Sequence, residues 1–208
     1  MAEHSAKIIL AGKNVMQSVQ LTDRRLAVGG FTLIESMVVI AIIAILSAIL
    51  VPAGTNMLAR NQSYNAANEL QTMLTTARQI AASTATPITL CPMQANHCNP
   101  DWNLPLAIFQ DNNGNQQLDS GEILHYQLER HLYGQWLSNR PASSPFVRYT
   151  AQGFSLGTAG TFVFCHQSHI PSHHKQVILS RQGRVRITSY LTPGGLPDPN
   201  LDHLSCNN

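Results

Sequence analysis

The chain has 208 residues, enough for one domain or for one domain with an attached segment. Charged residues make up 12% of it, against about 25% in a typical soluble protein. Hydrophobic residues make up 44%, so the composition supports a core and excludes a disordered chain. The formal net charge of +2 is too small to indicate a partner by itself.

Residues 31–51 form the first predicted element, FTLIESMVVIAIIAILSAILV, in which Glu35 is the single charge. At about 1.5 Å rise per residue, a helix of this length spans roughly 31 Å, enough to cross a bilayer core. Because Arg24 and Arg25 precede it, we expect the N-terminus to lie inside and the rest of the chain outside. A secretory signal peptide, cleaved after the apolar stretch near Ala48, is the competing interpretation.

Glu35 decides between these interpretations. A carboxylate four residues into a membrane helix is costly and therefore usually marks function. Together with the preceding Gly30, the stretch GFTLIES resembles the processing motif of type IV prepilins. The resemblance implies that a prepilin peptidase cuts between Gly30 and Phe31, that Phe31 is then N-methylated, and that the helix is retained. It also implies that Glu35 pairs with the amino terminus of a neighbouring subunit during assembly, which fits the need of a buried carboxylate for a cation.

Residues 1–30 would then be a cleaved leader peptide, with four basic and two acidic side chains. This leader is longer than is usual in the family. A start downstream of Met1 would leave the mature protein unchanged.

Residues 52–86 are predicted to continue the helix, with a kink at Pro52. Apolar side chains recur at three- and four-residue spacing, which is typical of an amphipathic helix packed on a domain. They are Met57, Leu58, Tyr64, Ala67, Leu70, Met73, Leu74, Ala77 and Ile80. We expect the helix to end between Thr84 and Pro87.

Residues 87–190 change to short strand-like segments separated by Asn-, Asp- and Gly-containing turns. The expected strands are Ile88–Cys91, Leu106–Gln110, Ile123–Leu128, Phe146–Thr150, Thr161–Cys165, Gln176–Ser180 and Arg184–Tyr190. One helix followed by many strands predicts an α+β fold in which an antiparallel sheet packs on the helix. Residues 191–208, with three prolines and two glycines, are expected to be mostly loop.

Four cysteines in a chain that is expected to be exported predict two disulfides, with three possible pairings. We favour Cys91–Cys98, which closes a short loop, and Cys165–Cys206, which ties the tail to the body. Free buried thiols are the alternative.

The body also resembles the GspH/FimT group of pilin-like proteins. Three stretches carry this resemblance: AIFQDNNGNQQLDSGEIL, GFSLGTAGTFVFC and VILSRQGRVRI. With the N-terminal motif they cover most of residues 29–190. The resemblance implies the type IV pilin fold, with one long N-terminal helix whose apolar half is transmembrane.

Two segments contain side chains that could ligate a metal ion. In residues 111–122, oxygen-bearing side chains fall at calcium-loop positions, but the glycine is at Gly114 rather than at 116, so we interpret the segment as a hairpin turn. Around Cys165, four histidines could hold zinc: His166, His169, His173 and His174. We interpret this second segment as an exposed polar loop that could gain positive charge beside Lys175 at mildly acidic pH. We therefore expect neither a metal nor a cofactor.

The strongest functional signal is the segment RQGRVR, residues 181–186. Gln182-Gly183 can turn the chain, and strand alternation then puts Arg184 and Arg186 on one face and Val185 and Ile187 on the other. Arg181 lies at the same turn, and Lys175 opens the incoming strand. Such a cluster suits a phosphate backbone. Because the turn contains no aromatic residue and Tyr190 is only close to it, we expect backbone contacts rather than base stacking.

A charged edge strand that merely resists aggregation is the alternative on composition alone. GRVR, however, resembles the G-R-x-R motif of FimT-type minor pilins that bind DNA in natural transformation. The resemblance implicates Arg184 and Arg186, with Gly183 as the turn; Arg181 and Lys175 are added from their proximity in sequence.

The sequence therefore predicts a minor type IV pilin, not an enzyme, that binds extracellular double-stranded DNA. Its partners would be DNA, other major and minor pilins, and the prepilin peptidase. It would lie in the bacterial inner membrane with its C-terminal domain in the periplasm, and later in the pilus. One alternative is a structural minor pilin or type II secretion pseudopilin that primes assembly without binding DNA. Another is an adhesin that responds to metal or pH through the histidines.

Overall fold

The computed structural model describes Gly30 and residues 32–129, 133–138, 145–155, 157, 159–191 and 206. Phe31, the rest of the predicted leader and most of the predicted tail lie outside these residues. The chain divides into two units, residues 1–45 and 46–208.

A single helix, α1 (Leu33–Thr84), fills most of the N-terminal half of the described chain. Thr32 begins it, because the Thr32 Oγ1 atom accepts the backbone N–H of Glu35 at 3.2 Å. At the other end, Ala85 takes a left-handed conformation, with φ 51°, and stops the helix ahead of Pro87. Helix is assigned through Pro52 without a break, and the kink expected there stays a prediction.

Burial changes abruptly along α1. Every described residue from Thr32 to Leu58 is exposed. Among the described residues, α1 is the one helix that is long and apolar enough to cross a membrane. From Ala59 onward one face is buried, at Ala59, Ser63, Ala66, Ala67, Leu70, Met73, Leu74, Ala77 and Ala81. The predicted amphipathic face is therefore confirmed from Ala67 to Ala77. It was wrong for Met57, Leu58 and Tyr64, which are exposed because packing on the domain begins only at Ala59.

The first sheet has the order β2-β1-β3-β4, and β6 also pairs with β1. All of its pairings are antiparallel. The strands are β1 (Ile88–Gln94), β2 (His97–Cys98), β3 (Leu106–Gln110), β4 (Leu124–Leu128) and β6 (Val147–Tyr149).

The second sheet has the order β5-β7-β8-β9, again antiparallel. Its strands are β5 (Gly134–Ser138), β7 (Gly160–His166), β8 (Lys175–Leu179) and β9 (Val185–Ser189), with a short 3-10 helix, η1 (Pro171–His173), between β7 and β8. All seven predicted strands are present with ends shifted by a few residues. The sequence missed β2 and β5, because β2 has two residues and β5 buries only Trp136.

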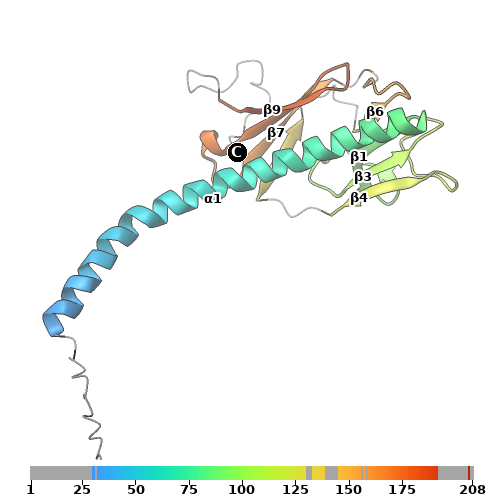
Figure 1. The fold of residues 1–208 in the computed structure, drawn as a ribbon. Helices are drawn as coiled ribbons and strands as arrows, with labels where there is room; N and C mark the ends of the chain where they lie inside the picture. The colour runs from blue at the N-terminus through green and yellow to red at the C-terminus, as the bar shows by residue number, and fades with distance from the viewer. Residues whose placement is uncertain are drawn as a thin grey trace, which may run out of the picture. The chain divides into compact units, whose positions relative to one another are not determined.

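Both sheets pack on the second half of α1 (Figure 1). The main core joins the buried face of α1, from Ala66 to Ala81, to alternate residues of β1, β3, β7 and β8. This is the predicted α+β arrangement, confirmed here with two sheets where one was expected. The β8–β9 hairpin, which carries the arginine segment, is the far edge of the second sheet.

Candidate nucleic-acid interface

The arginine segment forms a tight turn between β8 and β9. The backbone N–H of Ser180 donates to the Arg184 carbonyl at 2.9 Å, and that of Gly183 donates to the Ser180 carbonyl at 2.9 Å. The Ser180 hydroxyl oxygen also accepts the N–H of Arg184 at 3.1 Å. Gly183 has φ +77°, so the predicted turn at Gln182-Gly183 is present and uses glycine where the backbone is left-handed.

Glycine is needed at position 183 for a second reason, which is close packing. A Cβ atom there would lie 2.5 Å from the Gly153 carbonyl oxygen and 3.1 Å from Arg78 Nε. Arg78 itself donates from Nε to that same carbonyl at 2.9 Å. The turn is therefore seated directly on α1 and on the loop that follows β6.

Ser155 holds the other side of the turn. Its backbone N–H donates to the Arg181 carbonyl at 3.2 Å, and its hydroxyl lies 2.9 Å from the Ser180 carbonyl. Ser155 is buried, so these bonds are shielded from water. Sequence reasoning missed Ser155 and Arg78, because both reach the turn only through the fold.

The three arginines of the segment are exposed, while Val185 and Ile187 pack against the core. The predicted alternation along β9 is thus observed, with Arg184 and Arg186 on the outer face. Among the residues that the structure describes, no carboxylate forms an ion pair with Arg181, Arg184 or Arg186. Half-buried Arg78 adds a fourth guanidinium at the base of the turn. Such a surface can bind anions through charge and forked hydrogen bonds.

Lys175 does not join this group. It pairs with Ser189 at the opposite end of the hairpin from the turn. By strand alternation it also shares the face of Val177 and Leu179, which is the core side of the sheet. The expectation that Lys175 converges with the arginines is therefore wrong.

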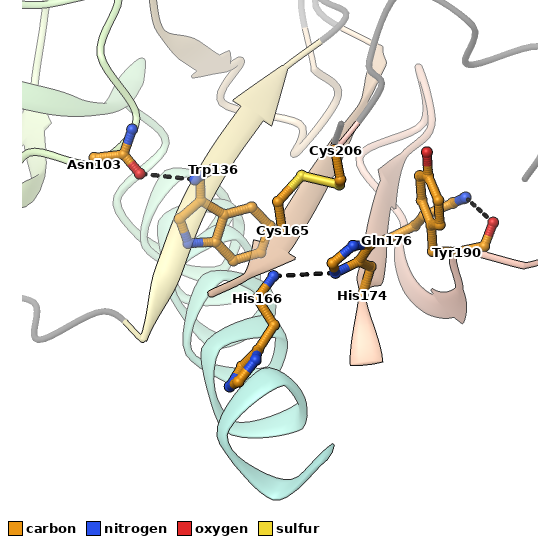
Figure 2. Close-up of a disulfide and its surroundings, with 8 residues drawn as sticks. All are labelled: Asn103, Trp136, Cys165, His166, His174, Gln176, Tyr190 and Cys206. Carbon is orange, nitrogen blue, oxygen red and sulfur yellow. Dashed lines mark hydrogen bonds between the residues drawn. A yellow bond between two sulfur atoms is a disulfide. The ribbon is translucent and has the colours of Figure 1, made fainter. Parts of the chain in front are cut away.

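Two aromatic residues near the hairpin are placed differently from what the sequence suggested. Tyr190 is buried, and its ring centroid lies 5.4 Å from that of His174, so it offers no free face (Figure 2). Phe154 is 52% exposed and precedes Ser155, the residue bonded to the turn. No local sequence signal links Phe154 to the arginines.

Residues 111–122 close on themselves through their own side chains. Asp119 accepts from the amides of Asn113 and Asn115, and the Glu122 carboxylate accepts the backbone N–H groups of Asn112 and Asp119. Arg148 donates to the Asp111 carbonyl at 2.7 Å, and its guanidinium lies against Gly114. An arginine cation thus contacts the loop, and the carboxylate oxygens of Asp119 and Glu122 shape its turns.

Three of the four histidines are buried, which corrects their expected exposure, whereas the intervening residues 167–172 are exposed as expected. His166, His173 and His174 are each 3% exposed or less, and only His169 of the four is exposed. His174 Nδ1 accepts the backbone N–H of His166 at 3.1 Å (Figure 2). The side chain of His166 reaches α1, where its Nε2 atom lies 2.9 Å from the side-chain oxygen Oε1 of Gln62. These histidines tie β7 and β8 to the helix.

Burial lowers the pKa of these three histidines. It lowers the pKa of His174 to about 4, helped by the neighbouring histidines. Burial likewise lowers the pKa of His166, with a smaller effect of His173, and the pKa of His173, with a smaller effect of Arg60. These shifts oppose the gain of positive charge that was expected of these three residues at mildly acidic pH.

The structure pairs Cys91 with Cys98 and Cys165 with Cys206, the pairing favoured from the sequence. The second bond joins the C-terminal segment to β7, 41 residues away in sequence (Figure 2). At the other end of the chain, Gly30 and Glu35 are both exposed, and Phe31 lies outside the described residues.

Comparison with known proteins gives two family matches. The family described as type II transport protein GspH matches residues 66–183, and the prokaryotic N-terminal methylation motif matches residues 25–51. No curated protein sequence matches the chain.

Solved structures similar to this chain include the type IV minor pilin FimU of Pseudomonas aeruginosa. The identity is 23%, covering 62% of this chain and 90% of that one, with a TM-score of 0.47. The minor pseudopilin EpsH from the type 2 secretion system of Vibrio cholerae is 12% identical, covering 62% of this chain and 97% of that one, with a TM-score of 0.44.

Proposed function

The chain belongs to the GspH family and carries the N-terminal methylation motif of pilin-like proteins, and we propose that it is a minor type IV pilin that binds extracellular DNA for uptake. One observation supports DNA as the ligand. Arg181, Arg184 and Arg186 are exposed together on a turn that is fixed by Ser155 and Arg78. Because the backbone of the turn is already fixed, only the side chains lose freedom when the guanidinium groups engage phosphate oxygens.

The contacts would be made to the sugar-phosphate backbone of double-stranded DNA. They would therefore be independent of sequence, weak for each subunit and strongly dependent on salt. The GRVR sequence, residues 183–186, adds a resemblance to the motif of DNA-binding FimT-type pilins. The protein would catalyse no reaction.

A fragment lacking residues 1–57 is suited to the test, because the part of the described helix that is removed with these residues is exposed. Binding to a labelled duplex would be followed by fluorescence anisotropy at several salt concentrations. We expect Arg184→Gln/Arg186→Gln to weaken binding and to reduce the slope of log K against log salt by about two units.

Arg60→Gln is a matched control. It removes one positive charge, against two in the double variant, from an exposed site on α1 that lies about 27 Å along the helix from Arg78. We expect it to change binding much less than the double variant. An affinity for the duplex that does not depend on salt concentration, or that is unchanged in Arg184→Gln/Arg186→Gln, would show that the hairpin does not bind DNA.

A structural role is the second candidate, and the GspH match itself favours it. In that case the chain would prime a type IV or type II secretion filament through pilin contacts alone. The fragment would then show no salt-dependent DNA binding, and the arginines would serve to keep the edge strand β9 soluble.

The N-terminal motif supports the same processing in both cases. We propose cleavage between Gly30 and Phe31, methylation of Phe31, and pairing of Glu35 with the amino terminus of a neighbouring pilin. The chain would enter the inner membrane with residues 52–208 in the periplasm before it is built into the filament.

A further inference from the structure

An exposed aromatic residue adjoins the residue that is bonded to the arginine turn. Phe154 is 52% exposed, and it is the only exposed phenylalanine among those that the structure describes. Its neighbour Ser155 bonds the Arg181 carbonyl with its N–H and the Ser180 carbonyl with its hydroxyl. The backbone of Phe154 is therefore one residue away from direct contact with the turn.

The loop that carries Phe154 is well ordered by its own hydrogen bonds. The N–H of Thr150 donates to the Phe154 carbonyl at 2.9 Å, and the N–H of Phe154 donates to the Thr150 hydroxyl at 3.2 Å. Gly153, at φ +77°, is held by Arg78 through its carbonyl. The backbone that carries this ring is therefore held in place relative to the turn.

Positive charge and an exposed ring together favour one kind of ligand. Proteins that bind single-stranded nucleic acid combine cationic groups on the phosphates with aromatic side chains on which bases stack. Inside a duplex each base is already stacked on its neighbours, so an outer ring gains no base face there. An overhang, a frayed end or a single strand does supply an unpaired base.

We propose that Phe154 stacks on an unpaired base while Arg181, Arg184 and Arg186 hold the adjoining phosphates. The site then takes duplex DNA through the arginines alone and binds single-stranded DNA or overhangs more tightly. This inference rests on the proposed DNA-binding function and names the form of DNA that the same surface prefers.

The test compares a labelled single strand with a blunt duplex of the same sequence, using the full-length chain in detergent micelles. We expect Phe154→Leu to weaken single-strand binding about tenfold, as loss of one stacked base does, and to leave duplex binding within about twofold. Phe154→Trp should retain the preference. Because Trp102 and Trp136 are buried, quenching of the added indole by the single strand reports stacking directly.

Tyr126→Leu is the matched control, since it removes a similarly exposed ring from β4 of the first sheet. It should leave both affinities unchanged. Thermal unfolding midpoints of the Phe154 and Tyr126 variants that equal the wild-type midpoint would show that neither substitution perturbs the fold.

Two failures are distinguishable. If Phe154→Leu weakens both ligands equally or neither, while Arg184→Gln/Arg186→Gln weakens both, the stacking role is wrong and the DNA-binding function stands. If the arginine variant changes neither affinity, the proposed function itself is wrong.

Discussion

At the scale of single residues, Gly183 connects the hairpin to the rest of the domain. It meets two separate requirements, a left-handed backbone and room for the Gly153 carbonyl. Gly157 meets only the first, because its φ is +63° and nothing lies within 4 Å of the place where a Cβ atom would be. The two glycines therefore allow conformational strain to be separated from steric conflict.

We expect Gly157→Ala to lower the free energy of unfolding by about 1 kcal/mol, the usual cost of a side chain in the left-handed region. Gly183→Ala should cost at least about 2 kcal/mol more, because the turn must also move away from Gly153. Urea unfolding of the fragment lacking residues 1–57 measures both. Equal losses would mean that the hairpin shifts without cost, and the arginines would then not be fixed by this packing.

The same residues mark how far the sequence alone could go. The turn at Gln182-Gly183 and the outward arginines were predictable, because alternation along β9 is local. Arg78, Phe154 and Ser155 were not, because the fold brings them to the turn from distant segments. Lys175 was misplaced for a related reason: closeness in sequence did not give the pairing register, which sets it opposite Ser189.

At the scale of elements, the connection between β7 and β8 joins the second sheet to α1 through buried histidines. His174 accepts a backbone N–H at Nδ1, so that atom carries no proton. The groups facing it are His166, His169 and His173, with Arg60 contributing from α1 beside His173. Further positive charge is unfavourable in these surroundings, which the polar appearance of the segment in sequence did not reveal.

This arrangement predicts acid sensitivity. In the unfolded chain a histidine binds its proton near pH 6.5, whereas His174 in the folded chain does so only near pH 4. The unfolded state thus binds more protons between these values. The contribution of neutral His174 to the free energy of unfolding is fully present above pH 6.5. It is lost as the pH falls toward 4, which lowers the free energy of unfolding by up to about 3 kcal/mol.

His174→Asn tests this assignment, because an amide oxygen can accept the same N–H and cannot be protonated in this range. We expect urea midpoints of the wild type to fall more steeply between pH 7 and pH 4.5 than those of the variant. His169→Asn, at the exposed member of the four, is the control and should keep the wild-type slope. Parallel curves for wild type and His174→Asn would rule out His174 as the source.

At the scale of the whole molecule, α1 has two different surfaces along its length. Residues up to Leu58 are exposed on every side, and those from Ala59 bury one face in the domain. No described residue covers this first part, which fits the membrane anchoring and the association with other pilins that the family implies. Glu35 is the one charge within its apolar segment.

We expect Glu35→Gln to be processed like the wild type yet to be missing from the filament fraction, since an amide cannot neutralise a neighbour's amino terminus. N-terminal mass analysis should find methylated Phe31 as the first residue of both chains. Glu129→Gln, which alters an exposed carboxylate of the domain, should be incorporated normally. Normal incorporation of Glu35→Gln would remove the pairing role of this carboxylate.

The seat of the arginine turn also has a mechanical consequence. A tensile load applied at Arg184 or Arg186 does not have to travel through the chain termini, because the Gly183–Gly153–Arg78 contacts connect the hairpin sideways to α1. The nearest route for the load is through the Arg78–Gly153 hydrogen bond and the bonds of Ser155 to the turn. The hairpin is thus connected to α1 as well as to its neighbouring strand.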